Sequence, residues 1–237
     1  MYLTLYELNN ITKWRYKVSD NSISTEYYNK FWNLCESYIS PKISPNLISF
    51  LGFMFIVSNY IVSSIYFTTY PFYVGLYVSI VTHIYCHLDA IDGIHARNTK
   101  TSSPLGELVD HICDAIGLIF IILTFCNIFN INDMYTQTYL SLAGIIGFQF
   151  FHIQAYLNKD VKFGRFSGPT ELLTYYSFII LGKTFGIIDE KYFNDVITIL
   201  APYIFMLFFV GIKYYFIILL LNYEIKVRGF GVLGFWG

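Results

Sequence analysis

Six long apolar segments limit the folds that are open to this chain. A helix needs about 20 mainly apolar residues to cross roughly 30 Å of hydrocarbon. Pro71, Pro104 and Pro169 stand where new helices are expected to begin. The six segments cover residues 47–67, 72–92, 105–127, 136–157, 170–188 and 195–221. The sequence therefore predicts an all-α integral membrane protein with a core of six transmembrane helices.

The composition agrees with a membrane protein and argues against other classes. Of the 237 residues, 55% are apolar and only 13% are charged, which is typical neither of a disordered chain nor of a soluble domain. The net charge of -1 supplies no strong positive field, so we expect no nucleic-acid partner. The four cysteines show no CxxC or Cys/His spacing, and we expect neither a disulfide nor a zinc site.

The chain divides into three parts by polarity. Residues 1–46 form a polar N-terminal arm, 47–225 form the six-helix membrane domain, and 226–237 form a short tail. The arm lacks the pattern of a cleaved signal peptide. An interfacial amphipathic helix is predicted within it, because aromatic and apolar residues alternate there with Lys30 and Glu36. Its apolar members are Tyr27, Tyr28, Phe31, Trp32 and Leu34.

Lysine and arginine are distributed unevenly between the two sides of the predicted membrane domain. Twelve of them fall in the arm, in alternate loops and in the tail, whereas only Lys183 and Lys191 fall on the opposite side. Because cytoplasmic loops carry an excess of these residues, both termini are expected to face the cytosol. The basic set comprises Lys13, Arg15, Lys17, Lys30, Lys42, Arg97, Lys100, Lys159, Lys162, Arg165, Lys226 and Arg228.

Four carboxylates lie at the facing ends of the second and third apolar segments. Asp89 and Asp92 are three residues apart, and Asp110 and Asp114 are four apart, so each pair shares one helical face. A cluster of like charges at a membrane boundary costs several kcal/mol per uncompensated ion. Divalent cations would compensate it, and a ligand set made only of oxygen favours Mg²⁺ or Mn²⁺ over zinc.

Residues between these carboxylates are suited to binding phosphate. Gly93 and Gly106 allow a close approach to the backbone, and Arg97 can donate two hydrogen bonds to phosphate oxygens. The helix expected to begin at Pro104 points its amide dipoles at an anion. Two metals that bridge a diphosphate stabilise both the attacking and the leaving oxygen, so the pattern indicates phosphoryl transfer.

The stretch DAIDGIHAR followed by NTKTSSPLGELVDHICD resembles the signature of the CDP-alcohol phosphotransferase family. All eight fixed positions are filled. The residues between them are similar to the eukaryotic choline/ethanolamine phosphotransferase branch, which transfers an amino-alcohol phosphate from its CDP derivative to diacylglycerol and releases CMP. The eight positions are Asp89, Asp92, Gly93, Ala96, Arg97, Gly106, Asp110 and Asp114.

The resemblance implies a role for each matching position. Its metal ligands would be Asp89, Asp92 and Asp110, with Asp114 as a further ligand or the general base. Its CDP pocket would be lined by Gly93, Ala96, Arg97 and Gly106, with Asn46 as a further nucleotide contact.

A second candidate for the general base comes from the residues themselves. Glu107 and His111 are four apart beside the Asp110/Asp114 face, and an imidazole oriented by a carboxylate suits a lipid hydroxyl. The sequence leaves the choice between Asp114 and His111 open.

The resemblance also implies a homodimer in the endoplasmic reticulum or Golgi membrane, with CDP-ethanolamine or CDP-choline and diacylglycerol as substrates. Two weaker matches lie at Ser44 to Ser49 and around His152 and Gly168 to Glu171. Residues 153–154 read Ile-Gln where the family commonly has Thr-Gly, which removes an expected polar contact.

Three alternatives remain beside this reading. The first is a CDP-diacylglycerol-dependent phosphatidyltransferase that uses inositol, serine or glycerol phosphate as acceptor. The second is a divalent-cation transporter, which leaves Gly93, Arg97 and Gly106 without a role. The third is an inactive, truncated core, because eukaryotic members usually continue with further helices. His83, His87 and Lys213 are interpreted as structural residues.

Overall fold

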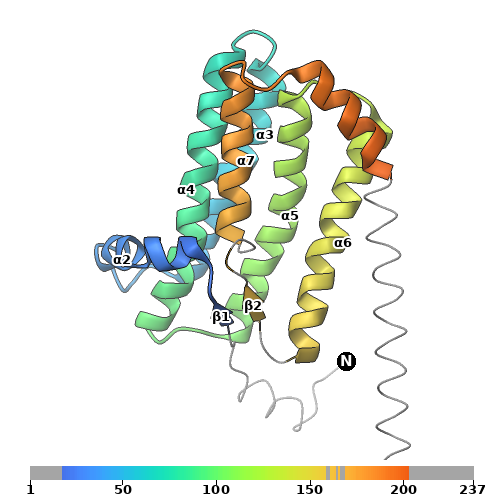
Figure 1. Ribbon diagram of the computed structural model, residues 1–237. Helices are drawn as coiled ribbons and strands as arrows, with labels where there is room; N and C mark the ends of the chain where they lie inside the picture. The colour runs from blue at the N-terminus through green and yellow to red at the C-terminus, as the bar shows by residue number, and fades with distance from the viewer. Residues whose placement is uncertain (1–17, 159–160, 164, 166–168, 203–237) are drawn as a thin grey trace, which may run out of the picture.

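Long, roughly parallel helices form a bundle in the computed structural model of the chain (Figure 1), which describes residues 18–158, 161–163, 165 and 169–202. Two three-residue strands, β1 (Val18–Asp20) and β2 (Val161–Phe163), pair in parallel, and the rest of the regular structure is helical. A further helix covers residues 190–202. The other helices are α2 (Ile23–Ser37), α3 (Pro45–Tyr66), α4 (Pro71–Asn98), α5 (Pro104–Ile128), α6 (Met134–Asn158) and α7 (Pro169–Thr184).

Proline marks the first residue of α3, α4, α5 and α7. This position tolerates proline because its missing N–H would have no partner inside the helix, and the fixed φ already matches a helix. At α5 the Ser103 Oγ also accepts a hydrogen bond from the Gly106 N–H at 3.1 Å, which caps the helix. The helix starts predicted at Pro71, Pro104 and Pro169 are therefore confirmed.

Three helices in the described part of the chain, α3, α4 and α5, are long and apolar enough to cross a membrane. Leu108, Ile112 and Ile116 recur every four residues on α5 and remain exposed, as expected for a lipid-facing stripe. These helices fit an integral membrane protein. Most of the sixth predicted segment, with Lys213, lies outside the described residues, as does the tail 226–237.

The second predicted segment differs from the structure at its end. We expected it to stop near residue 92, but α4 continues without a break to Asn98. Gly93, Ala96 and Arg97 are therefore helical rather than part of a loop. His95 and Arg97 lie in the last turn, where basic side chains interact favourably with the helix dipole and support the extension.

Helix packing follows a simple order in space. α3 packs against α4 and α5, α7 packs against α4, and α6 packs against α5. A core of buried apolar residues lies at the end of the bundle away from the α4–α5 connection. Its members are Phe67, Val74, Val78, Cys126, Ile128, Phe129, Ile131 and Ile180.

The close approach of α4 and α7 depends on Gly75. A Cβ at this position would collide with the side chain of Thr184. We expect Gly75→Ala to destabilise the protein by about 1–3 kcal/mol, because the two helices must move apart. Thermal unfolding in lipid–detergent micelles measures the effect, and adding Thr184→Ala should restore most of the lost stability. An unchanged melting temperature in the single variant would contradict this packing.

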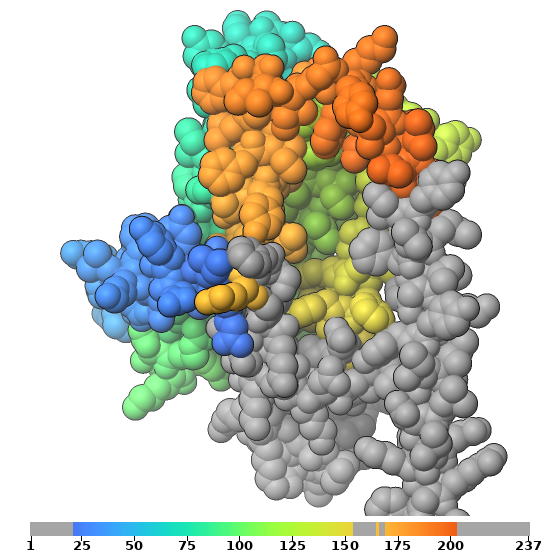
Figure 2. All heavy atoms as spheres, in the orientation of Figure 1, coloured from blue at the N-terminus to red at the C-terminus, as the bar shows by residue number. Residues whose placement is uncertain are grey.

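The short helix α2 lies across the bundle axis rather than along it (Figure 1). Its side chains project from one flank of the bundle (Figure 2). Trp32, which is buried, anchors the helix: its Nε1–H donates to His87 Nδ1 on α4 at 3.0 Å. Tyr27, Phe31 and Leu34 remain exposed. Because His87 accepts this hydrogen bond from Trp32, its interpretation as a structural residue is supported.

Among the described residues, several of the basic residues predicted to share one side of the membrane lie at one end of the bundle. The end of α4, which carries Arg97, contacts α2, which carries Lys30. The Arg165 carbonyl accepts a hydrogen bond from the N–H of Ile23, the first residue of α2, at 3.2 Å. Lys183 instead pairs with Glu190 at the opposite end. In the described part of the chain, Lys30 and Arg97 therefore lie at the end of the bundle opposite to Lys183.

Candidate functional site

Three of the four aspartates converge at the interface of α4 and α5. One carboxylate oxygen each from Asp89, Asp110 and Asp114 lies within 4.8 Å of the others. The register of the two helices produces this arrangement, because Asp110 and Asp114 are one turn apart on α5 and both face Asp89 on α4. All three side chains are half-buried. The predicted convergence of the two carboxylate faces is therefore observed.

The fourth aspartate, Asp92, lies at the edge of this cluster. It is only 5% exposed, and its side chain lies against that of Asp110. The hydroxyl of Ser49 on α3 donates a hydrogen bond to its Oδ2. Ser49 belongs to the weak family match at Ser44 to Ser49, but no role was predicted for it. Only the packing of α3 against α4 reveals that contact.

Tyr85 was missed by the sequence analysis and contacts the cluster directly. Its hydroxyl donates to Asp114 Oδ1 at 2.7 Å, so it links α4 to α5. Tyr85 precedes Asp89 by four residues, which places both side chains on one face of α4. That spacing is the signal that would have identified it.

The donor set fits a hard divalent cation. The cluster offers carboxylate oxygens alone, and Mg²⁺ and Mn²⁺ prefer such ligands. The hydroxyls of Ser49 and Tyr85 are neutral, so they orient Asp92 and Asp114 without compensating their charge. A cation held by Asp89, Asp110 and Asp114 would supply that compensation.

The predicted nucleotide-binding residues gather beside the aspartates. A Cβ at Gly106 would lie 3.3 Å from Asn46 Oδ1, so the start of α3 approaches the first turn of α5. A Cβ at Gly93 would lie 3.3 Å from Arg97 Nη1. Ala96 is half-buried next to the exposed Arg97. Without side chains at the two glycines, this face offers a guanidinium, an amide and accessible backbone to an anion.

The two candidate bases lie on neighbouring turns of α5. The ring of His111 contacts the ring of His152 on α6, with centroids 4.3 Å apart and planes at 73°. Glu107 lies one turn before His111 on the same helix. His152, noted in the sequence only as a weak match, thus joins α6 to this region. Asp114 and His111 both remain candidates in this geometry.

Glu171, in the first turn of α7, connects this helix to α2. It is 4% exposed, and its Oε1 accepts a hydrogen bond from the Ser24 N–H in the first turn of α2 at 2.8 Å. Its Oε2 is buried and lacks a hydrogen-bond partner among the described residues. The carboxylate therefore faces the positive end of α2 with one oxygen and retains a second acceptor.

Comparison with known proteins assigns the chain to a family. The family model for CDP-alcohol phosphatidyltransferase matches residues 42–219, which include the whole aspartate cluster. An uncharacterized CDP-alcohol phosphatidyltransferase class-I family protein of Schizosaccharomyces pombe is 33% identical over 178 residues, covering 72% of this chain and 46% of that protein.

Two further relatives carry more specific names. Cholinephosphotransferase 1 of Saccharomyces cerevisiae is 28% identical over 183 residues, covering 74% of this chain and 46% of the relative. Ethanolaminephosphotransferase 1 of Homo sapiens is 30% identical over 139 residues, covering 54% and 35%. The chain thus spans less than half the length of these curated relatives. On its motif, its aspartate cluster and the match across most of its length, this chain belongs to the CDP-alcohol phosphatidyltransferase family.

Proposed function

We propose that this protein is a phosphotransferase of phospholipid synthesis that transfers phosphoethanolamine or phosphocholine from its CDP derivative to diacylglycerol and releases CMP. The observation that carries the proposal is the convergence of Asp89, Asp110 and Asp114 beside Arg97 and the two glycines. Relatives named cholinephosphotransferase and ethanolaminephosphotransferase support this substrate class.

In this proposal Asp89, Asp92, Asp110 and Asp114 would hold two Mg²⁺ or Mn²⁺ ions. Such ions neutralise charge that develops on the diphosphate as the phosphoryl group moves. Ser49 and Tyr85 keep two of the carboxylates in place by hydrogen bonds. The chain's own contribution is a rigid pair of helices that fixes the spacing of the ligands.

The nucleotide would bind next to the metals, between the end of α4 and the start of α5. Arg97 would donate hydrogen bonds to phosphate oxygens, and Asn46 would contact the nucleotide from the start of α3. Gly93, Ala96 and Gly106 would leave space for the CDP moiety. The N-terminus of α5 lies beside this space, and the positive end of its helix dipole favours an anion.

The diacylglycerol hydroxyl must lose a proton as it attacks the phosphorus bound to the amino alcohol. Asp114 or His111 would accept that proton, with Glu107 orienting the imidazole in the second case. His111 lies against His152 on α6, whereas Asp114 lies inside the metal cluster.

The proposed membrane arrangement is supported by the three described apolar helices and by the charge pattern of the sequence. Six helices would span the bilayer, and α2, with its exposed Tyr27, Phe31 and Leu34, would lie at the interface. The site would face the cytosol of an endoplasmic reticulum or Golgi membrane; Lys30 and Arg97, which lie at its end of the bundle, support this orientation. Diacylglycerol would enter from the bilayer, and the protein would work as a homodimer.

The direct test is CMP release by the purified chain in lipid–detergent micelles. Diacylglycerol, Mg²⁺ or Mn²⁺, and either CDP-ethanolamine or CDP-choline are supplied, and the two donors are compared. CMP that depends on both the metal and diacylglycerol supports the proposal. If folded protein releases CMP only from CDP-diacylglycerol with inositol, serine or glycerol phosphate, the chain is a phosphatidyltransferase of that kind instead. If folded protein releases no CMP from any of these donors, the chain is an inactive core.

Tyr85 supplies a smaller test of the same site. We expect Tyr85→Phe to lower turnover by about tenfold, because Asp114 loses one hydrogen bond to a charged acceptor while the ring packing remains. The CMP-release assay, with a metal titration, measures the effect. Tyr77→Phe is the matched control, since the Tyr77 hydroxyl bonds Ser58, away from the aspartates, at 2.9 Å. Equal turnover in the two variants would exclude a role for Tyr85.

A further inference from the structure

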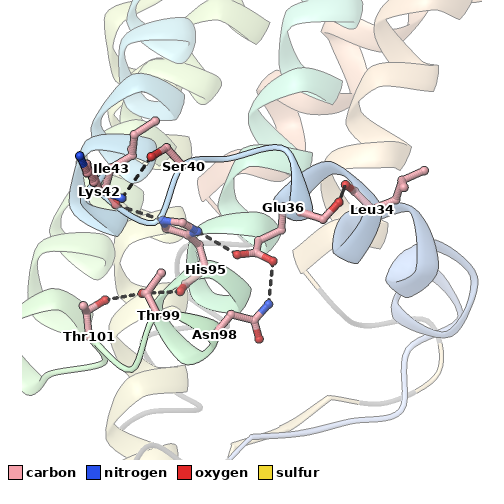
Figure 3. Close-up of polar contacts among 10 residues, drawn as sticks. Leu34, Glu36, Ser40, Lys42, Ile43, His95, Asn98, Thr99 and Thr101 are labelled. Carbon is pink, nitrogen blue, oxygen red and sulfur yellow. Dashed lines mark hydrogen bonds and ion pairs between the residues drawn. The ribbon is translucent and has the colours of Figure 1, made fainter.

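A buried polar cluster joins α2 to the last turn of α4 (Figure 3). Glu36 Oε1 lies 2.9 Å from His95 Nδ1, and Glu36 Oε2 accepts a hydrogen bond from Asn98 Nδ2 at 2.7 Å. His95 Nε2 lies 3.0 Å from the Ile43 carbonyl oxygen. His95 is fully buried, and Glu36 is 9% exposed. We refer to Glu36, His95, Asn98 and the Ile43 carbonyl as the α2–α4 clamp.

Two oxygen acceptors from different segments surround the ring of His95. The Ile43 carbonyl can only accept, so Nε2 must donate to it. At Nδ1 the ring faces a carboxylate, which also accepts when it is ionised. The hydrogen bonds from His95 and Asn98 hold the pKa of Glu36 below its usual range, which favours the ionised form. The ionised Glu36 carboxylate and the Ile43 carbonyl then face the two ring nitrogens of His95.

The polar side chains of the clamp are costly to bury unless each has a hydrogen-bond partner, so we ask which elements these contacts connect. Removing the Glu36 carboxylate would leave the buried His95 ring and the Asn98 amide without this partner. These contacts lie next to the residues predicted to bind the nucleotide. His95 lies two residues before Arg97, Asn98 directly follows Arg97, and Ile43 lies three residues before Asn46. The clamp therefore holds both of the elements that present Arg97 and Asn46.

We propose that Glu36 and His95 are positioning residues, which set the affinity for the CDP moiety by holding the last turn of α4 and the segment before α3 in register. The inference rests on the proposed function. Neither residue is placed in contact with the substrate. The contacts by which they act are the two hydrogen bonds of the Glu36 carboxylate and the hydrogen bond of His95 to the Ile43 carbonyl.

The test compares two substitutions of Glu36 with one control on the same helix. Glu36→Ala removes the acceptor for both His95 and Asn98. Glu36→Gln keeps the shape, and its amide can donate to a neutral His95 Nδ1 while its oxygen accepts from Asn98. Glu26→Ala alters an exposed glutamate in the first turn of α2. Binding of CMP with Mg²⁺, steady-state turnover and hydrogen exchange at residues 93–98 are measured for each.

We expect Glu36→Ala to weaken CMP binding by about tenfold, because hydrogen bonds to a charged group are lost. The KM for the CDP-alcohol should rise in proportion, while kcat changes by less than about threefold, since the clamp is remote from the reacting atoms. Hydrogen exchange at residues 93–98 should accelerate. Glu36→Gln should restore most of the CMP affinity, and Glu26→Ala should match the parent protein.

Several results would overturn the proposal. If Glu36→Ala lowers the melting temperature but leaves CMP affinity and KM unchanged, the clamp is only structural. If Glu36→Ala does not fold, Asn98→Ala removes a single hydrogen bond, and it must shift CMP affinity in the same direction for the proposal to stand. A parent protein that binds CMP but turns over no CDP-alcohol refutes the proposed reaction and leaves the clamp measurable by binding. A parent protein that binds no CMP refutes both.

Discussion

Asp110→Asn is expected to reduce CMP release by at least about a thousandfold, the largest effect of any substitution considered for this site. Asp110 contributes an oxygen to the cluster with Asp89 and Asp114, and its side chain also lies against Asp92. The amide keeps the size of the side chain but removes one negative charge from both contacts. Turnover per folded molecule and binding of Mn²⁺ alone measure the loss.

Asp133→Asn is a matched control for that substitution. Asp133 lies outside the cluster and caps α6, where its Oδ2 accepts a hydrogen bond from the Thr136 N–H at 2.7 Å. Asparagine also caps helices well, so we expect unchanged turnover. The Asp110 variant should insert into membranes and unfold thermally like the parent protein. Appreciable turnover in a folded Asp110→Asn variant would refute the assignment of the metal ligands.

His111→Gln has the second-largest expected effect and separates the two candidate bases. If the imidazole accepts the proton of the lipid hydroxyl, turnover should fall by about a hundredfold to ten-thousandfold, the usual contribution of a positioned base. CMP binding with Mg²⁺ should remain, because His111 is on the side of α5 that contacts His152 on α6. The measurement combines CMP release with CMP binding in the same preparation.

His83→Gln serves as the corresponding control on α4. His83 lies one turn before His87 and is interpreted as a packing residue, so turnover should stay close to that of the parent protein. Near-normal turnover in His111→Gln would leave Asp114 as the base. Loss of both CMP binding and turnover would instead show that His111 supports the nucleotide site, and the assignment as base would be wrong.

Much of the local architecture was predictable because it depends on short-range chemistry. The starts of α4, α5 and α7 follow from proline at the first helical position. The cluster of Asp89, Asp110 and Asp114 follows from carboxylates three and four residues apart on two successive helices. The predicted end of α4 was about one and a half turns too early, because the apolar stretch ends near residue 92 while the helix continues to Asn98.

Contacts between distant segments could not be predicted, because side-chain spacing along one helix says nothing about the rotation of its neighbour. Ser49 reaches Asp92 only because α3 packs on α4, and His111 meets His152 only because α6 packs on α5. Glu36 and His95 are 59 residues apart, and no local pattern joins them.

By itself, the sequence determined the apolar helices, the unequal charge on their two ends and the carboxylate pairs, since each of these depends on residue type and helical period alone. The tertiary structure decided which hydroxyls orient the carboxylates and which buried contact, between Glu36 and His95, holds the end of α4. These depend on how whole helices pack, where burial makes a polar group costly unless a partner from another element meets it.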